Sequence, residues 1–305
     1  MNEELIKRIQ QLKAARRAVI LAHNYQIGEV QDIADFTGDS LGLSVQASRT
    51  DAEVIVFCGV LFMAETAAIL SPAKTVLLPD KHAGCPMADM IDAPQLEKLK
   101  AQHPGAVVVC YVNSSAEVKA LSDYCCTSSN AVELVGSLPE DGEIIFVPDK
   151  NLGRHVENKT GRKMILWQGY CPTHIWITRE DVLEAQKKHP EAVLMAHPEC
   201  ADDVKAMADE LLSTGQMLKF AKASPARQFI VATERGILHT LRKESPGKEF
   251  FEASRRAVCP NMKKITLEKI LWSLEDMQYQ ITVPTDVAER AINALQRMIE
   301  VVPAR

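Results

Sequence analysis

One dipeptide recurs along this chain at nearly even intervals. Cys-Pro occurs at Cys85-Pro86, Cys171-Pro172 and Cys259-Pro260, and the spacings are 86 and 88 residues. The chain has eight cysteines, and none of the other five precedes a proline. Since proline makes up about 5% of an average protein, chance does not account for three such pairs. The spacing indicates a threefold internal repeat, which favours three similar units.

The repeat carries the hydrophobic pattern of alternating strands and helices. AVILAHNY (18–25), AVVVCYVN (106–113) and AVLMAHPE (192–199) each combine an apolar, β-branched run with a polar triplet. A stretch with apolar residues three and four positions apart, typical of an amphipathic helix, precedes each of them. A second buried-strand run follows in every repeat: EVIVFCG (53–59), EIIFVPD (143–149) and QFIVATE (228–234). Strands that alternate with helices predict βαβ units and parallel sheets.

We therefore expect an α/β protein of three similar αβα domains with parallel sheets, in a pseudo-threefold arrangement around a central active site. Strand-like runs precede the first two Cys-Pro pairs, whereas the run before the third, EFFEASRRAVC (249–259), is degenerate. The RHVENKTGRK stretch (154–163) predicts a solvated loop. The expected segments are three α/β repeats at 1–86, 87–172 and 173–260, and a C-terminal helical segment at 261–305 that packs on the repeats.

Bulk composition argues against several classes of partner and location. A net charge of −5 offers no basic surface for nucleic acid. The longest apolar runs are too short to cross a bilayer, and the charged N-terminal stretch lacks the apolar core of a signal peptide. Eight cysteines without such a signal favour the reducing cytoplasm, where thiols act as ligands or packing groups.

Aligning the repeats on their first strands brings further polar residues into register. The cysteines follow the starts of the polar triplets after 62, 60 and 62 residues. A hydroxyl at a helix start is most simply a cap, but three at matched offsets favour one shared pocket for an anion. Residues just beyond the ends of parallel strands face the binding crevice of such sheets. The triplets begin at His23, Tyr111 and His197, and a hydroxyl follows each after 17 residues, at Ser40, Ser128 and Thr214.

Three thiolates from three domains favour an iron–sulfur cluster over zinc. Structural zinc sites usually take four ligands, often with a close Cys-x-x-Cys pair, and this chain has no such pair. Three cysteines leave one iron of a [4Fe–4S] cluster without a protein ligand, open to substrate. An open iron is a Lewis acid that can help a hydroxyl group depart as water. The proline after each cysteine stiffens the corner that carries the thiolate.

The remaining polar residues favour acid–base chemistry on a small, anionic, oxygen-rich substrate. Their side chains can move protons among carbonyl, imine and hydroxyl groups, in a reaction that includes dehydration. The candidates are His23, Tyr25, Tyr111, Asn113, His174, His197 and Glu199.

Longer motifs throughout the chain resemble the quinolinate synthetase A family of bacterial NAD biosynthesis. They are AHNYQ, GDSLGLS, GCPMADM, YVNSSAEVKA, GYCPTH, AHPEC, STGQM, TERGILHTL and CPNMKKITLEKI. The resemblance implies three similar α/β domains and condensation of iminosuccinate (iminoaspartate) with dihydroxyacetone phosphate to quinolinate, with loss of phosphate and water. It also implies an oxygen-sensitive [4Fe–4S] cluster and a partner oxidase that supplies the unstable iminosuccinate.

The resemblance assigns roles to residues at the matching positions. It makes Cys85, Cys171 and Cys259 the cluster ligands. The stretch CPNM (259–262) lacks the Cys-x-x-Cys that some relatives carry there, which leaves thiol–disulfide regulation at this place in doubt. The implied acid–base residues are Tyr25 and Glu199, with His23 and His197 beside them and His174 near the cluster. The implied substrate-binding residues are His23, Ser40, Tyr111, Asn113, Ser128, His197, Glu199 and Thr214.

Three other functions stay open from the residues alone. An iron–sulfur hydro-lyase acting on a small hydroxy acid would not consume a triose phosphate. A three-domain radical enzyme of the diphthamide type would cleave S-adenosylmethionine. A cluster-based iron or oxygen sensor would not be an enzyme, and it would need a DNA- or partner-binding element that the acidic composition disfavours.

Overall fold

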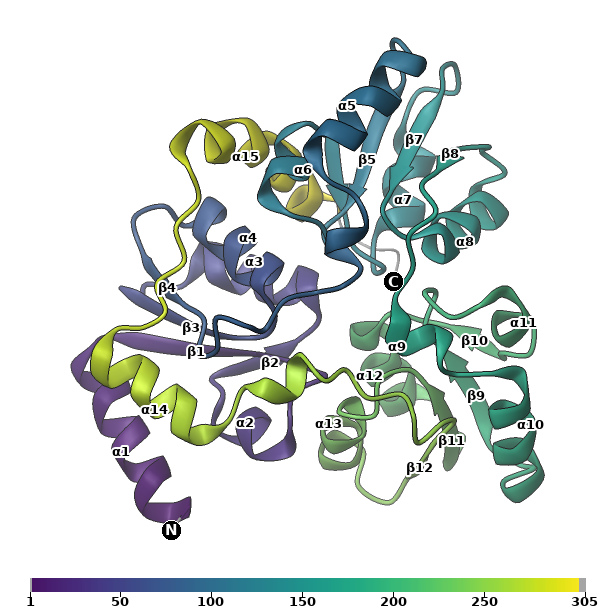
Figure 1. Cartoon of the computed structure of the whole chain (residues 1–305). Coiled ribbons are helices and arrows are strands. Elements are labelled where there is room, and N and C mark those ends of the chain that lie inside the picture. Colours follow the sequence, from purple (N-terminus) through teal and green to yellow (C-terminus); the bar gives the residue numbers. More distant parts are fainter. Residues whose placement is uncertain (1, 302–305) are drawn as a thin grey trace.

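Three four-stranded sheets of the same topology form the framework of the chain (Figure 1). The computed structural model describes residues 2–301. Within each sheet all neighbouring strands are parallel, and the first strand lies between the second and the third. The predicted α/β class with three similar parallel sheets is confirmed. The strands are β1 (Ala18–His23), β2 (Phe36–Gly38), β3 (Val54–Cys58) and β4 (Thr75–Leu77); β5 (Val107–Tyr111), β6 (Tyr124–Cys126), β7 (Ile144–Val147) and β8 (Ile165–Leu166); and β9 (Val193–Ala196), β10 (Glu210–Leu211), β11 (Gln228–Ala232) and β12 (Glu249–Glu252).

Helices precede and connect the strands in the same order in every repeat. The first repeat has α1 (Asn2–Ala15), α2 (Gly28–Ile33), α3 (Ser40–Arg49) and α4 (Leu61–Leu70). The second has α5 (Ala93–Gln102), α6 (Ala116–Ala120), α7 (Ala131–Ser137) and α8 (Lys150–Thr160). The third has α10 (Arg179–Lys188), α11 (Asp202–Lys205), α12 (Thr214–Ala223) and α13 (Ile237–Glu244). The last two helices of each repeat pack together, as α3 with α4, α7 with α8 and α12 with α13.

Alternate residues of a strand pack into the apolar cores on opposite faces of its sheet. In the third sheet, Leu194 and Ile230 belong to a core cluster on one face, whereas Met195, Phe229 and Val231 belong to a cluster on the other. Successive side chains of a strand point to opposite faces, so both faces of this sheet are covered by apolar neighbours. The first two repeats share one continuous core.

Two local expectations were wrong. The degenerate run before the third Cys-Pro pair forms strand β12, which pairs with β11 and buries Phe250. Glutamates can occupy both ends of this strand because β12 lies at the edge of its sheet and has a solvent-exposed side. The first seven residues of the RHVENKTGRK stretch (154–160) are helical, because α8 buries Leu152 and Val156 four residues apart and ends before the left-handed Gly161.

The C-terminal segment bridges the first two repeats. Helix α14 (Leu267–Asp276) packs on α1, and α15 (Thr285–Glu300) packs on α4 and α6 (Figure 1). The expected segments also include residues 1 and 302–305, which lie outside the described residues. No helix within residues 2–301 has both the length and the apolar character needed to span a bilayer.

An equivalent side chain in each repeat reaches across to another repeat. Eight residues after the start of each polar triplet stands Gln31, Lys119 or Lys205, and all three side chains are buried. Each donates to the backbone carbonyl oxygen four residues beyond the end of β3, β7 or β11. The contacts are Gln31 Nε2 to Gly236 (2.9 Å), Lys119 Nζ to Phe62 (3.2 Å) and Lys205 Nζ to Asn151 (2.6 Å).

We name these contacts the inter-repeat latches. The first repeat reaches the third, the second reaches the first, and the third reaches the second, so the latches form a closed ring. Hydroxyls reinforce two of them: Lys119 Nζ also donates to Thr66 Oγ1 (2.9 Å), and the equivalent Thr240 donates to Gln31 Oε1. Buried donors and acceptors are costly to leave unpaired, so each latch fixes the relative position of two repeats.

Candidate active site

The C-terminal ends of β1, β5 and β9 meet at one pocket. The cavity measures about 940 Å³, partly open to solvent, and residues of all three repeats line it. In each sheet the chain leaves the first strand toward one neighbour and returns to the other, which is the switch point where α/β sheets bind ligands. Every site residue predicted from the sequence lines this pocket: His23, Tyr25, Ser40, Cys85, Tyr111, Asn113, Ser128, Cys171, His174, His197, Glu199, Thr214 and Cys259.

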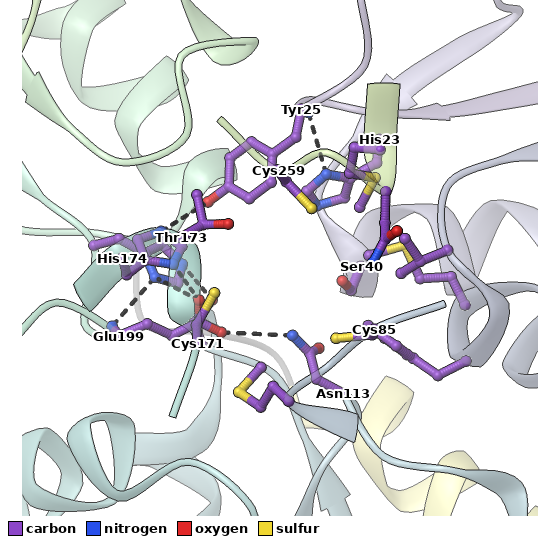
Figure 2. Close-up of a pocket in the computed structure, with 18 of the residues that line it drawn as sticks. His23, Tyr25, Ser40, Cys85, Asn113, Cys171, Thr173, His174, Glu199 and Cys259 are labelled. Atoms are coloured by element: carbon purple, nitrogen blue, oxygen red, sulfur yellow. Dashed lines mark hydrogen bonds and ion pairs between the residues drawn. The ribbon is translucent and has the colours of Figure 1, made fainter. Parts of the chain in front are cut away.

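The three Cys-Pro pairs form similar corners at the pocket. A short helical turn follows each pair: η1 (Ala88–Met90), α9 (Pro172–Ile175) and η2 (Met262–Lys264). Figure 2 shows the sulfur atoms of Cys85, Cys171 and Cys259 directed toward the same open space. In each corner, the backbone N–H three residues after the cysteine is close enough to favour the thiolate and so acts to lower the pKa of the thiol: Ala88, His174 and Met262.

Burial makes these thiols hard to ionise without a cation. It raises the pKa of Cys85 to about 12 and also raises the pKa values of Cys171 and Cys259. The thiolate charge of Cys259 raises the pKa of Cys85 further, and that of Cys85 raises the pKa of Cys171. A coordinated metal ion reverses this situation because its charge stabilises the thiolate. The three thiols, each with an N–H group that favours the thiolate, therefore fit a metal-containing group.

The other five cysteines are excluded from the pocket. They are buried, unpaired in disulfides and absent from the residues that line the cavity: Cys58, Cys110, Cys125, Cys126 and Cys200. The described residues thus offer the pocket three thiols and no fourth.

A second donor group overlaps the cysteine corners. Within residues 2–301, the one group of three side chains close enough to hold a single ion is Cys171, His174 and Glu199, with ligand atoms within 4.8 Å of one another. His174 Nδ1 lies 2.7 Å from Glu199 Oε2, within ion-pair distance, but the contact lacks hydrogen-bond geometry and this buried nitrogen has no other partner. The three Cys-Pro cysteines do not form such a compact group with one another. A single zinc ion would hold its thiolates about 3.8 Å apart, given 2.3 Å bonds at the tetrahedral angle.

A hydrogen-bonded chain runs from Glu199 to Tyr25. The other ring nitrogen of His174, Nε2, lies 2.8 Å from Thr233 Oγ1 and 3.4 Å from the hydroxyl of Tyr25. The Tyr25 hydroxyl is 2.6 Å from the same threonine oxygen. These contacts provide a path for protons between a carboxylate and a phenol that lie on either side of the His174 ring (Figure 2).

Glu199 is held as a carboxylate by its neighbours. Burial alone would raise its pKa, but the charge and hydrogen bond of His174 bring the pKa below its usual range. Tyr111 donates to Glu199 Oε1 at 2.7 Å, and Asn113 Nδ2 lies 3.5 Å from that oxygen. Burial raises the pKa of Tyr25 and of Tyr111, so both phenols keep their protons at neutral pH.

His23 and His197 are neutral imidazoles at physiological pH. Burial lowers the pKa of each to about 3. His23 packs edge-on against Tyr25, and His197 stacks on His174 with ring centroids 4.7 Å apart. His197 Nε2 also lies 3.2 Å from Ser128 Oγ. Neutral imidazoles in these positions can hydrogen-bond to a substrate without adding charge.

The predicted hydroxyls lie at the pocket, but none of them is a helix cap. The caps are the preceding residues Asp39, which accepts from the N–H of Gly42, and Ser213, which accepts from that of Gln216. Ser40 and Thr214 are therefore the first residues of α3 and α12, and both line the cavity, although Thr214 Oγ1 also accepts from Asn24 Nδ2 at 3.0 Å. Ser128 precedes α7 by three residues.

Several residues of the site carried no clear sequence signal. Ser129 Oγ lies 2.6 Å from Asp39 Oδ2 and 2.9 Å from Ser213 Oγ, which joins one residue from each repeat at the pocket wall. Thr233 completes the chain between His174 and Tyr25. The repeat alignment could have found Asp39 and Ser213, because both precede a predicted hydroxyl.

Comparison with known proteins matches nearly the whole chain. The family model described as quinolinate synthetase A protein matches residues 7–300. The chain is 58% identical to a quinolinate synthase of Methanosarcina barkeri over 298 residues, which cover 98% of both chains. It is 55% identical to a quinolinate synthase of Dehalococcoides mccartyi and 51% identical to that of Thermodesulfovibrio yellowstonii, each over 303 residues that cover 99% of this chain and all of the relative.

Proposed function

Because this chain belongs to the quinolinate synthetase A protein family, we propose that it condenses iminosuccinate with dihydroxyacetone phosphate. The products are quinolinate, phosphate and water, and the reaction is a step in the de novo synthesis of NAD. The observation that carries the proposal is the set of three free Cys-Pro thiols on a pocket with acid–base groups from all three repeats.

We assign Cys85, Cys171 and Cys259 as the ligands of a [4Fe–4S] cluster. The pocket offers three thiols, and these three do not form a compact single-ion group, which favours a larger group with several metal ions. The N–H groups that favour each thiolate are of the kind that tunes such clusters. When bound, the cluster supplies an open iron as a Lewis acid for the loss of a hydroxyl group as water.

Hydroxyl groups and helix starts bind the carboxylates and the phosphate in this proposal. Among the residues that the structure describes, no lysine or arginine lines the pocket. Ser40 and Thr214 open helices of ten residues, whose free N–H groups and dipoles attract anions. Asn113 and the neutral His23 and His197 add donors that can orient the substrate oxygen atoms.

Glu199, His174 and Tyr25 move the protons. Glu199 is a carboxylate at neutral pH and accepts a proton as the ring becomes aromatic. His174 connects it to Tyr25 and Thr233, so a proton accepted at one nitrogen of the imidazole can be returned from the other. Tyr25 keeps its phenolic proton and donates it to an oxygen of the triose phosphate. Tyr111 holds Glu199 in place through its 2.7 Å hydrogen bond.

Two further expectations belong to this proposal. We expect the protein to work in the reducing cytoplasm, where free cysteines such as these eight serve as ligands or packing groups. Iminosuccinate decays in water, so an oxidase that produces it would hand it over in a transient contact.

Anaerobic purification followed by an assay with both substrates tests the function. We expect about four irons per chain and the appearance of quinolinate and phosphate in equal amounts when an oxidase generates iminosuccinate in the assay. Cluster assembly without consumption of the triose phosphate would instead support a hydro-lyase. A protein that forms quinolinate at full rate without iron would refute the Lewis-acid role.

A further inference from the structure

Two buried carboxylates lie behind the cysteine corners, outside the pocket. Asp149 and Glu234 are both 0% exposed, and both stand two residues beyond the end of the third strand of their sheet. The register of the sheets makes them equivalent, because Cys110 pairs with Val147 and Ala196 pairs with Ala232. A buried carboxylate is costly unless it is fully hydrogen-bonded, so the partners of these two indicate their role.

Asp149 binds the backbone of the second cysteine corner. Its Oδ2 accepts from the N–H of Cys171 at 3.2 Å, and its Oδ1 accepts from the N–H of Leu152 at 2.6 Å. Two residues on, Asn151 Nδ2 donates to the backbone oxygen of Glu199 at 3.2 Å. This segment therefore connects a cysteine corner of one repeat to the acid–base residue of the next.

Glu234 has the same role at the third corner. Its Oε1 accepts from the N–H of Cys259 at 3.2 Å, and its Oε2 accepts from that of Gly236 at 2.7 Å. Lys263 forms an ion pair with Glu234 at 2.9 Å and also donates to the backbone oxygen of Tyr25. Again a carboxylate connects a cysteine corner to an acid–base residue of another repeat.

The first repeat lacks this device. The equivalent position is occupied by Val60, whose side chain cannot accept a hydrogen bond. The corner of Cys85 therefore differs from the other two in what fixes its backbone.

We propose that Asp149 and Glu234 are positioning residues for the cluster ligands Cys171 and Cys259, an inference that rests on the proposed function. In each corner the carboxylate fixes the N–H of the cysteine, and the N–H three residues later lies where it favours the thiolate. A thiolate held in this way is preorganised for metal. Partners of this type typically change metal affinity about 10- to 100-fold.

The isosteric variants Asp149→Asn and Glu234→Gln test the inference. Both oxygen atoms of each carboxylate accept a backbone N–H, so an amide must turn its NH₂ group toward one of these donors. We expect both variants to release iron to a ferrous chelator about 10- to 100-fold faster than the parent enzyme under anaerobic conditions. The electron paramagnetic resonance spectrum of the reduced cluster should shift as well.

Glu65→Gln is the matched control, because it makes the same change in a partly buried carboxylate on α4 that does not line the pocket. Iron release at the parent rate from Asp149→Asn and Glu234→Gln would overturn the inference, since a carboxylate that merely fills space is replaced without loss. If either isostere fails to fold, Asp149→Ser and Glu234→Ser, which leave room for water, carry the same expectation. A parent protein that assembles no cluster would instead refute the proposed function.

Discussion

His174 Nδ1 lies 2.7 Å from Glu199 Oε2 in a fully buried pair. The contact joins the second Cys-Pro corner to the polar triplet of the third repeat. Because Tyr111 donates to the other oxygen of Glu199, the carboxylate is bound on both sides before any substrate arrives. Preorganised charge of this kind stabilises a developing positive charge with little rearrangement.

Replacing Glu199 with glutamine should lower kcat by about 10²–10⁴-fold, the usual contribution of a general base. The amide cannot accept a proton, and it breaks the ion pair with His174. Steady-state kinetics of the iron-loaded enzyme measures the effect, with the iron content checked first. Glu65→Gln serves as the isosteric control, and a kcat of the Glu199 variant close to that of the parent would exclude the general-base role.

We expect a single alanine substitution at any one of three cysteines to abolish both the visible cluster absorption and quinolinate formation. The three positions are Cys85, Cys171 and Cys259. Two ligands are too few to hold the cluster against exchange with solution. Absorption spectra and iron counts of the anaerobically reconstituted proteins measure this outcome. Cys58→Ala is the matched control, since Cys58 is buried in β3 and does not line the pocket. A fully coloured Cys171→Ala protein would be incompatible with the assigned ligands.

His23 and His197 should make the protein less stable as the pH falls from about 6.5 toward 3. Their folded pKa values are lowered to about 3 by burial, so in this window the unfolded chain binds more protons. Each histidine then contributes a slope of up to ~1.4 kcal/mol per pH unit to the free energy of unfolding.

Denaturant unfolding of the metal-free protein between pH 7 and pH 5, compared with His23→Asn and His197→Asn, measures these slopes. The comparison with variants is needed because the raised pKa values of Asp149 and Glu234 act in the opposite direction. Equal slopes in the parent and both variants would contradict the expected burial of neutral imidazoles.

Lys119→Met should lower the free energy of unfolding by about 1–3 kcal/mol, because the carbonyl oxygen of Phe62 and the hydroxyl of Thr66 lose their buried donor. Methionine keeps most of the side-chain volume, so the loss reports the hydrogen bonds. Chemical denaturation measures it. Lys98→Met, an exposed lysine on α5 of the same repeat, should change stability little. A variant as stable as the parent would mean that the latch is not a stabilising contact.

The sequence predicted the pocket residues because their chemistry recurs. His23, Tyr111 and His197 occupy one position of the repeat, and the hydroxyls and cysteines occupy two more, so the alignment selects them. Parallel sheets then bring strand ends to one edge, which is a general property of the fold class. The latch residues had the same kind of signal, since a buried valine precedes each of Gln31, Lys119 and Lys205.

Other features had no repeated pattern to reveal them. Thr233 lies between His174 and Tyr25, but its equivalents are Gly59 and Pro148, which share no chemistry with it. Asp149 and Glu234 are equivalent, but the first repeat has Val60 at that position, so the repeat alignment does not show a shared polar residue. Helix α8 was mistaken for a loop because it buries a narrow face beneath many charged side chains. Contacts between repeats depend on tertiary packing, which composition and periodicity do not encode.

The three inter-repeat latches form a closed ring, so each repeat is connected directly to both of the others. If one latch opens, the other two still connect all three repeats. The cysteine corners therefore do not separate when a single latch is lost. Moving one cysteine corner away from the other two therefore requires both latches of its repeat to open.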